Sequence, residues 1–256
     1  MRIFRSLDAF SPSRCITATV GSYDGVHCGH RVLLRQVVDE ARRSGGESLV
    51  VTFSPHPRLL LEKEPDLKLL TSPEEKFHLL EQLGIDNLVV IPFDRAFSRL
   101  SPQEFIRMLV REAGVSTLVI GYDHRFGHDK SGGHDLLLQL QEQYRLRIIE
   151  VAEQELEHEH LSSSAIRRLV ERGETEHAAR LLGSPYLLMA ERRPDGGLIP
   201  CDRHKLLPAP GDYRVRVELP HRLAGTTATL LIRPDGSLTL KTDEELPEGP
   251  LLLSFR

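Results

Sequence analysis

Residues 16–43 read ITATVGSYDGVHCGHRVLLRQVVDEARR, and this stretch decides the fold. The first five residues form an apolar, β-branched run typical of a buried strand. Residues 31–43 repeat apolar side chains at helical spacing, which predicts an amphipathic helix. Between them lies the turn GSYDGVHCGH, with three glycines and two histidines. A strand, a glycine-rich turn and a helix in this order predict the first unit of an α/β fold.

The same alternation continues along the chain. Further strands are expected at residues 49–53, 88–92, 117–121 and 146–151, and further helices at 72–83, 101–113, 165–172 and 174–182. Two of these helices open with Ser-Pro-x-Glu, at Ser72 and Ser101, which is a capping pattern. Strands that are apolar on both faces and separated by helices predict a doubly wound parallel sheet, with right-handed crossovers.

The periodicity changes to two after residue 186. Residues 213–219, YRVRVEL, alternate apolar and polar side chains, and two copies of RPDG, at 193–196 and 233–236, read as hairpin turns. We therefore expect an α/β domain over residues 1–186 and a small antiparallel β domain over residues 187–256. A sheet of that size has one apolar face to bury, so we expect it to pack on the α/β domain.

Composition limits the classes of function. The chain has 256 residues, a net charge of -4 and a sequence pI of about 6.3, which gives no electrostatic support for binding nucleic acid or an anionic membrane. No apolar stretch has the length of a membrane span or of a signal-peptide core. The three cysteines, Cys15, Cys28 and Cys201, are far apart, which favours a reducing cytoplasm over a disulfide framework.

The turn GSYDGVHCGH is a candidate phosphate site. A helix N-terminus offers unpaired N–H groups and the positive end of a dipole. Gly21, Gly25 and Gly29 allow the backbone to approach a ligand, and His27 and His30 can donate to charge that develops on a phosphate oxygen. The turn lacks the Lys-Ser/Thr of a Walker loop and the glycine spacing of the dinucleotide fingerprint.

A zinc site in this turn is the disfavoured alternative. It would use Asp24, His27, Cys28 and His30, and four ligands in one short turn do not make a tetrahedral site. The acidic tract at residues 153–160 has nothing to fix its geometry and is read as a solvated loop. We therefore expect no metal ligands in the chain.

Three further motifs carry polar groups that suit a nucleotide. In GYDHRFGH, residues 121–128, Arg125 can hold a phosphate and Asp123 can accept a hydrogen bond from a ribose hydroxyl or a base. In LSSSAIRR, residues 161–168, hydroxyls at a helix start lie beside two arginines. In FSPHPR, residues 53–58, two prolines stiffen a loop where a planar ligand can lie. Each motif taken alone is also compatible with an ordinary surface loop or helix cap.

Taken together, the motifs resemble the adenylyltransferase domain of bacterial FAD synthetases, which are usually bifunctional riboflavin kinase/FMN adenylyltransferase proteins. That family shows G-x-[FY]-D-G-V-H-x-G-H, F-x-P-H-P, L-T-x-P-E-E-K, P-F-D, G-x-[ND]-F-R-F-G and I-S-S-T-x-I-R in this order. The matching residues here are 21–30, 53–57, 70–76, 92–94, 121–127 and 161–167. The resemblance covers about residues 14–186 and implies a Rossmann-like nucleotidyltransferase fold.

The resemblance implies roles for particular residues. The catalytic residues would be His27, His30, Asp123, Ser163, Ser164 and Arg167. The residues that bind ATP or FMN would be Gly21, Tyr23, Asp24, Gly25, Gly29, Phe53, His56, Pro57, Arg58, Gly121 and Arg125. The FMN phosphate would attack the α-phosphate of ATP in line, giving FAD, and pyrophosphate would leave with Mg²⁺. Positioning and charge neutralisation would supply most of the rate.

The chain also departs from the family pattern. Ser164 stands where the family has Thr, His124 replaces an aromatic residue, and Arg31 replaces Gln. The kinase string G-R-x-x-G-F-P-T-A-N is not found in residues 187–256, so we expect a shortened kinase-like domain without kinase activity. The alternatives that stay open are a bifunctional enzyme, a protein that binds flavin or adenine nucleotides without turnover, and a nucleotidyltransferase with another acceptor.

Overall fold

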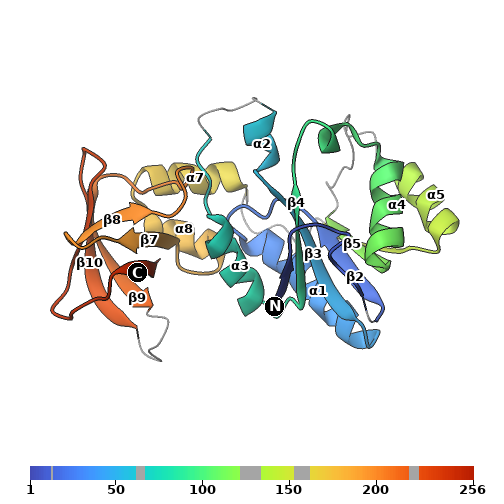
Figure 1. Cartoon of the computed structure of the whole chain (residues 1–256), viewed down its shortest axis with the longest axis horizontal. Coiled ribbons are helices and arrows are strands. Elements are labelled where there is room, and N and C mark those ends of the chain that lie inside the picture. The colour runs from blue at the N-terminus through green and yellow to red at the C-terminus, as the bar shows by residue number, and fades with distance from the viewer. Residues whose placement is uncertain (13, 62–66, 122–133, 153–161, 219–224) are drawn as a thin grey trace. The chain divides into compact units, whose positions relative to one another are not determined.

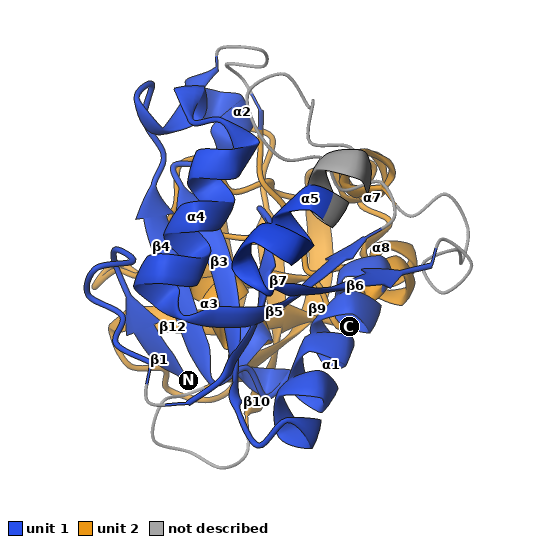
Figure 2. Ribbon diagram, turned by 90° about the vertical axis from the view of Figure 1, so that its right-hand side faces the viewer, with its two compact units in different colours: residues 1–23, 29–67, 80–158 blue, residues 24–28, 68–79, 159–256 orange. Residues whose placement is uncertain are grey.

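The computed structural model describes residues 1–12, 14–61, 67–121, 134–152, 162–218 and 225–256. Contacts divide the chain into two compact units, coloured separately in Figure 2. Unit 1 comprises Met1–Tyr23, Gly29–Leu67 and Leu80–His158, and unit 2 comprises Asp24–Cys28, Lys68–Leu79 and Glu159–Arg256. Unit 2 thus includes two short stretches of the N-terminal half, and the predicted boundary at residue 186 falls inside it.

Unit 1 is built on a six-stranded sheet in which every neighbouring pair of strands is parallel (Figure 1). The strands are β1 (Arg2–Phe4), β2 (Ile16–Val20), β3 (Glu47–Ser54), β4 (Asn87–Pro92), β5 (Val115–Gly121) and β6 (Arg147–Val151). Their order is β1-β4-β3-β2-β5-β6, so the direction of winding reverses between β2 and β5. Ligands of open α/β sheets bind at the carboxyl ends of the strands at such a reversal.

The helices follow the predicted alternation closely. Among the described residues they are α1 (Cys28–Arg43), α2 (Pro57–Leu60), α3 (Pro73–Gln82), α4 (Pro102–Ala113), α5 (His134–Tyr144), α7 (Ser163–Glu171) and α8 (Thr175–Leu182), with a 3-10 turn, η1 (Phe97–Arg99). The five predicted strands of the parallel sheet and five of these helices are confirmed, whereas β1, α2 and α5 were not predicted. Within the described residues, no helix combines the length and the apolar character needed to cross a bilayer.

The predicted helix caps are present. The Ser101 hydroxyl accepts a hydrogen bond from the Glu104 N–H at 3.3 Å, and the Glu104 carboxylate accepts from the Ser101 N–H at 2.9 Å. Ser72 and Glu75 make the same reciprocal pair at the start of α3. At the end of α4, Gly114 adopts the left-handed conformation, with φ of 62°. These local contacts explain why the helix boundaries could be read from the sequence.

The core of unit 1 lies on both faces of the sheet. Every residue of β2 is buried, so side chains that point to opposite faces are both covered. On one face, Ile16, Ala18 and Val20 join a cluster with Phe105 and Leu109 of α4. The apolar stripe of α1 is also buried but is not part of that cluster. Coverage of both faces is the predicted doubly wound arrangement.

Unit 2 contains a closed, six-stranded antiparallel barrel. Its strands are β7 (Leu187–Arg192), β8 (Gly197–Pro200), β9 (Gly211–Glu218), β10 (Thr226–Ile232), β11 (Leu238–Lys241) and β12 (Gly249–Phe255). The order around the barrel is β10-β11-β8-β7-β12-β9, and β9 closes it by pairing with β10. Closure leaves no sheet edge exposed.

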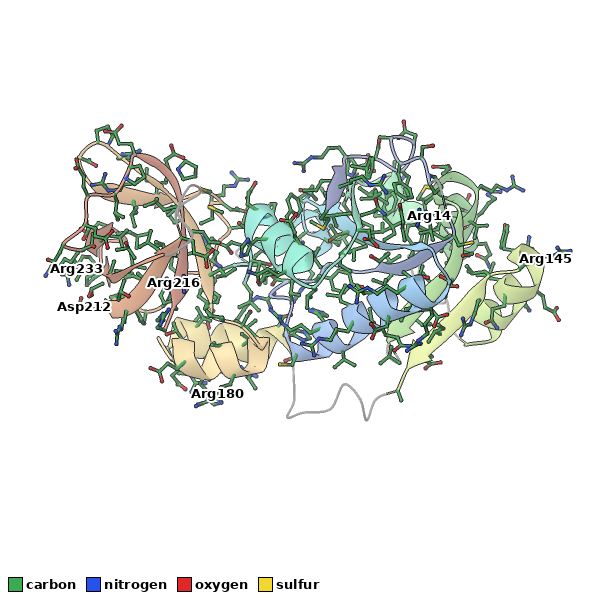
Figure 3. The ribbon with its side chains drawn as sticks, turned by 90° about the horizontal axis from the view of Figure 1, so that it is seen from below. Arg14, Arg145, Arg180, Asp212, Arg216 and Arg233 are labelled. Atoms are coloured by element: carbon green, nitrogen blue, oxygen red, sulfur yellow. The ribbon has the colours of Figure 1, made fainter. Side chains whose placement is uncertain are left out.

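Both RPDG sequences form the predicted hairpin turns. In the first turn, the Gly196 N–H donates to the Arg193 carbonyl at 2.9 Å, and Gly196 has φ of 83°. The turn between β10 and β11 repeats this geometry at Gly236, which also has φ of 83° and donates to Arg233 at 2.9 Å. The Arg233 side chain lies 3.5 Å from the carboxylate of Asp212 in an exposed ion pair (Figure 3).

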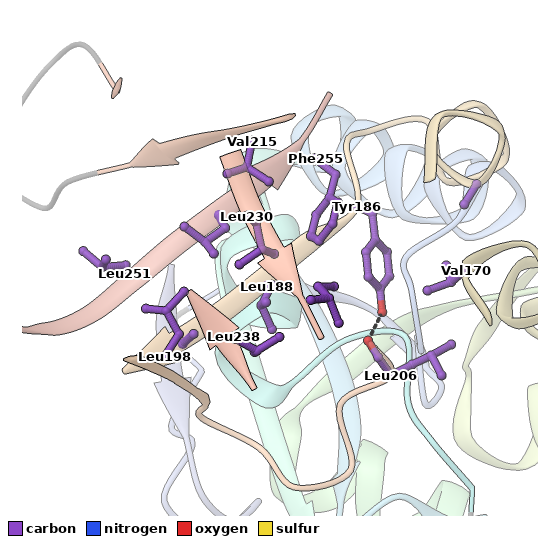
Figure 4. Packing of buried hydrophobic residues seen from close by; sticks show 14 of the residues in the cluster. Val170, Tyr186, Leu188, Leu198, Leu206, Val215, Leu230, Leu238, Leu251 and Phe255 are labelled. Carbon is purple, nitrogen blue, oxygen red and sulfur yellow. Dashed lines mark hydrogen bonds between the residues drawn. The ribbon is translucent and has the colours of Figure 1, made fainter. Parts of the chain in front are cut away.

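The inward-facing side chains of the barrel fill its interior. Figure 4 shows Leu188, Leu230 and Phe255 within this cluster, beside Tyr186, whose hydroxyl donates to the Leu206 carbonyl at 2.6 Å. The apolar face that was expected to pack on the α/β domain lies inside the barrel, in a cluster that also includes Leu70 and residues of α7 and α8. All six strands contribute buried apolar residues to this cluster, and closure of the barrel places them on its inside.

Helices α7 and α8 belong to the same hydrophobic core as the barrel. Ile166 and Val170 of α7, and Ala178 and Leu182 of α8, are fully or almost fully buried in this cluster. The sequence placed these helices in the N-terminal domain because they follow its helix-and-strand pattern. Packing instead groups them with the C-terminal unit, and this grouping brings the helix start at residues 162–164 into unit 2.

Candidate functional site

Residues 21–23, which begin the turn GSYDGVHCGH, belong to unit 1 and are held by contacts between uncharged groups. Gly21 follows β2, and its N–H donates to the Val51 carbonyl at 3.0 Å. The hydroxyl of buried Tyr23 lies 2.7 Å from the Thr19 hydroxyl, and burial raises the Tyr23 pKa. A Cβ on Gly21 would lie 2.9 Å from Cζ of Tyr23, so a larger residue would collide with this ring.

Tyr23 also supports one of the two histidines. Its ring meets the ring of His30 edge-on, with centroids 5.2 Å apart and an interplanar angle of 77°. His30 lies in the first turn of α1 and is half-buried. Aromatic edge-to-face contacts of this kind fix ring orientation. Tyr23 is therefore placed to orient a side chain that the sequence predicts to be catalytic.

Residues 24–28 of the turn belong to unit 2, and a buried ion pair holds Asp24 in place. Asp24 is 5% exposed, and its Oδ1 accepts from the N–H groups of Leu70 and Thr71 at 2.9 and 3.1 Å. Its Oδ2 accepts from Nη2 of Arg167 at 2.6 Å. The Gly25 N–H donates in turn to the Thr71 hydroxyl at 3.1 Å. The Asp24 carboxylate therefore ties together three segments that are distant in sequence.

The helix start of α7 meets this carboxylate. Arg167 is 7% exposed and donates from Nε to the Lys68 carbonyl at 2.9 Å, in addition to its bond with Asp24. The Ser163 hydroxyl donates to the backbone carbonyl of Asp24 at 3.2 Å, whereas Ser164 is exposed. The structure thus brings together Asp24, Ser163 and Arg167, three residues predicted to bind the substrates, and it pairs two of them with each other.

His27 is buried beside Asp24. Burial lowers the His27 pKa to about 4, and the negative charge of Asp24 partly opposes this shift. The imidazole is therefore neutral near pH 7. Lys76 of α3 is also buried. Burial lowers its pKa to about 8, and the negative charge of Asp24 partly opposes this shift. A neutral histidine can donate a hydrogen bond from one nitrogen without bringing a full positive charge.

Glycine is required at one position of this part of the turn. Gly25 has φ of +84°, a conformation that L side chains rarely adopt, and a Cβ there would lie 2.8 Å from Cδ1 of Leu70. Val26, which follows it, is fully buried with φ of 44°. Gly25 was predicted to let the backbone approach a ligand. The structure gives it another role as well, because the absence of a side chain allows the turn to pack tightly on Leu70.

The motif FSPHPR lies in unit 1 and is partly used by the fold itself. Nδ1 of His56 accepts from the Arg58 N–H at 3.2 Å and so caps α2, in which Pro57 is the first residue. The ring of Phe53 packs against Phe93, with centroids 5.5 Å apart. The sequence assigned Phe53, His56, Pro57 and Arg58 to ligand binding, and that assignment stays a prediction.

The motif at residues 121–128 is described only at its first residue. Gly121 is buried at the end of β5 and pairs with Val151. Because β2 and β5 are neighbours, the turn after β2 and residue 121 follow adjacent strands, as the sequence predicted. Asp123 and Arg125 lie outside the described residues. Gly29 is buried in the first turn of α1.

Sequence reasoning missed the partners that hold Asp24. It read residues 70–76 as a helix start, whereas the backbone of Leu70 and Thr71 binds the Asp24 carboxylate. It gave Glu75 only a capping role and gave Lys205 none, whereas the two form a buried ion pair at 2.7 Å. Both residues lie in polar segments, TSPEEK at residues 71–76 and CDRHK at residues 201–205, so no local pattern marks them as buried.

Comparisons with known proteins show which family this chain resembles. The profile of the FAD synthetase family matches residues 11–165. A bifunctional riboflavin kinase/FMN adenylyltransferase of Listeria monocytogenes is 30% identical over 249 residues, covering 92% of this chain and 77% of that protein. A FAD synthetase of the same organism is 29% identical over 203 residues, covering 79% of this chain and 81% of that protein.

A solved structure shares the fold over the whole chain. The crystal structure of a macrolide-efflux protein from Streptococcus pneumoniae has a TM-score of 0.82 to this chain. The match covers 99% of this chain and 96% of that one, at 24% sequence identity. The combination of a parallel sheet with a C-terminal barrel is therefore found in an experimental structure.

Proposed function

Because the chain belongs to the FAD synthetase family, we propose that it transfers the AMP group of ATP to FMN, giving FAD and pyrophosphate. The observation that carries the proposal is the position of the turn GSYDGVHCGH. It lies within the family match and follows the strand at which the parallel sheet reverses its winding. Ligands of open α/β sheets bind at that place. ATP and FMN are the substrates in this proposal.

The described side chains suit such a transfer. An FMN phosphate oxygen bonds to the α-phosphorus of ATP, and the bond from that phosphorus to the pyrophosphate oxygen breaks. Helix α1 begins directly after His27, so its first N–H groups and its dipole favour negative charge there. His27 and His30 donate to phosphate oxygens, and Tyr23 orients His30. Fixed donors act without reorganisation as charge develops.

Magnesium enters this proposal with ATP. Among the described residues, no group of three His, Cys, Asp or Glu side chains is placed to hold a metal ion. The Asp24 carboxylate is already bonded to Leu70, Thr71 and Arg167. These residues do not fit a resident metal, and we derive no step through one. Mg²⁺ would neutralise the phosphates of the nucleotide and leave with pyrophosphate.

A bifunctional enzyme is the second candidate. One observation favours it: the Listeria monocytogenes relative named as a riboflavin kinase/FMN adenylyltransferase matches 92% of this chain, which includes part of the barrel. Against it, residues 187–256 lack the family's kinase string. We therefore propose adenylyl transfer without kinase activity.

Product analysis separates these candidates. The purified protein is incubated with Mg²⁺, ATP and either FMN or riboflavin, and the flavins are separated by chromatography. FAD from FMN, with riboflavin unchanged, is the result expected here. Conversion of riboflavin to FMN would establish the bifunctional reading, and binding of FMN and ATP without any product would establish a non-catalytic nucleotide-binding protein.

A further inference from the structure

Lys205, between β8 and β9, is a buried cation that the proposed reaction does not use. Its Nζ donates to Oε2 of Glu75 at 2.7 Å, and the two side chains are 1% and 0% exposed. The ammonium group also lies 4.0 Å from the centre of the Tyr186 ring. Burial lowers the Lys205 pKa, while the charge of Glu75 opposes this shift. Every one of these groups belongs to unit 2.

Lys205 braces the segment that binds Asp24. Its Nζ donates to the Leu70 carbonyl at 2.5 Å. On either side of Lys205, the Leu69 N–H donates to the His204 carbonyl at 2.7 Å and the Leu206 N–H to the Leu69 carbonyl at 2.8 Å. The next groups along this segment, the N–H groups of Leu70 and Thr71, donate to Asp24. Residues 69–71 are therefore held between Lys205 and the turn.

Stability alone does not account for this arrangement. A buried ion pair usually contributes no more to stability than a well-packed apolar pair, because desolvating two charges offsets their attraction. The pair instead fixes positions. The Lys205 ammonium group donates to both the Leu70 carbonyl and the Glu75 carboxylate, so it holds the two groups at a set distance from each other. Glu75 in turn accepts from the Met189 N–H of β7 at 2.6 Å. The barrel is thus joined to the turn through bonds of fixed geometry.

We propose that Lys205 is a positioning residue for adenylyl transfer, holding residues 69–71 so that Asp24 keeps His27 and Arg167 in place. This proposal rests on the proposed function. It assigns the barrel a part in forming the phosphate-binding turn, beyond packing against α7 and α8.

Three variants of the full-length chain test it. Lys205→Met removes the ammonium group and leaves Glu75 buried without its cation. The double variant Glu75→Gln, Lys205→Met also removes that carboxylate charge, so that folding does not limit the measurement. Lys241→Met is the matched control, because Lys241 is an exposed lysine of the same barrel.

Two readouts are compared at a temperature well below unfolding. Amide hydrogen exchange at Leu70 and Thr71 should become about tenfold faster or more in both Lys205 variants, as expected for loss of a charged hydrogen bond. The kcat/KM for FAD formation should fall by a similar factor in both variants, even where the double variant unfolds like the wild type. Lys241→Met should match the wild type in both readouts.

Some outcomes would overturn the proposal. Wild-type exchange at Leu70 and Thr71 in both Lys205 variants would show that Lys205 does not hold the segment. Recovery of kcat/KM together with stability in the double variant would show a purely structural role, as would altered exchange with unchanged kcat/KM. If the wild type forms no FAD, the proposed function fails, while the exchange measurement still decides whether Lys205 holds the segment.

Discussion

The two units of this chain stabilise their parts of one turn by different means. In unit 1, Gly21 and Tyr23 are held by ring packing and a hydroxyl pair beside an apolar sheet. In unit 2, Asp24 is held by an arginine and two backbone N–H groups inside a network of buried charges. Neutral packing responds little to pH, whereas a buried charge that loses its partner destabilises strongly. Substitutions that break the contacts of Asp24 should therefore destabilise the protein more than substitutions at Tyr23.

Removal of residues 187–256 should have the largest effect. Without the barrel, the buried faces of α7 and α8, including Ile166, Val170 and Leu182, lose the cluster that covers them. We expect the remaining chain to be less stable by about 5 kcal/mol or more, since burial of each large apolar side chain is worth about 1.5–3 kcal/mol. Thermal unfolding and binding of a hydrophobic dye to residues 1–186 measure this. A melting temperature equal to that of the full chain would contradict it.

Breaking the ion pair at Asp24 should come next. Arg167→Met leaves a buried carboxylate without its cation and should lower the free energy of unfolding by about 3–5 kcal/mol. The double variant Asp24→Asn, Arg167→Met should recover part of this loss. The matched control is Arg233→Met, which breaks an exposed pair with Asp212 and should change stability by less than about 1 kcal/mol. Urea unfolding that shows equal effects for the two arginines would remove the contrast between buried and exposed charge.

The lowered pKa of His27 should be visible in the pH dependence of stability. Its pKa is about 4 in the folded chain and about 6.5 when unfolded, so the unfolded state binds the proton more readily. The stability associated with neutral His27 is thus fully present above pH 6.5 and is lost as the pH falls towards 4, by about 3 kcal/mol in all. His27→Gln should flatten this part of the curve. Identical pH slopes in wild type and His27→Gln would refute the assignment.

The smallest effect is expected in unit 1. Tyr23→Phe removes the hydroxyl that lies 2.7 Å from Thr19 and keeps the ring against His30. A neutral hydrogen bond contributes about 0.5–1.5 kcal/mol, so the loss should be of that order. The double variant Tyr23→Phe, Thr19→Val should be nearly as stable as the wild type, because neither hydroxyl is then left buried alone. A loss as large as that of Arg167→Met would show that the two sides of the turn do not differ.

Local sequence patterns predicted much of the fold. The caps at Ser72 and Ser101, and the turns at Gly196 and Gly236, depend on residues only a few positions apart, so the sequence reveals them directly. Closure of the barrel depends instead on pairing between distant strands, such as β7 with β12, which no local pattern specifies.

The candidate site was predicted only in part for the same reason. Asp24 and Arg167 were both recognised as important, but they are 143 residues apart, and nothing in their spacing shows that they bond to each other. Lys205 was overlooked because its partners, Leu70 and Glu75, are 135 and 130 residues away in sequence. Hydrogen bonds and ion pairs between residues far apart in sequence could therefore be found only from the structure.

Transfer of labelled phosphate from ATP tests the central claim most directly. With FMN, Mg²⁺ and ATP labelled at the α-phosphate, the label should appear in FAD, and label at the γ-phosphate should appear in pyrophosphate. His30→Ala should lower the rate by about 10²-fold, as loss of a transition-state donor does, with folding unchanged. With riboflavin in place of FMN, no γ-label should enter a flavin. Absence of α-label from FAD in the wild type, or an unchanged rate in His30→Ala, would contradict the account.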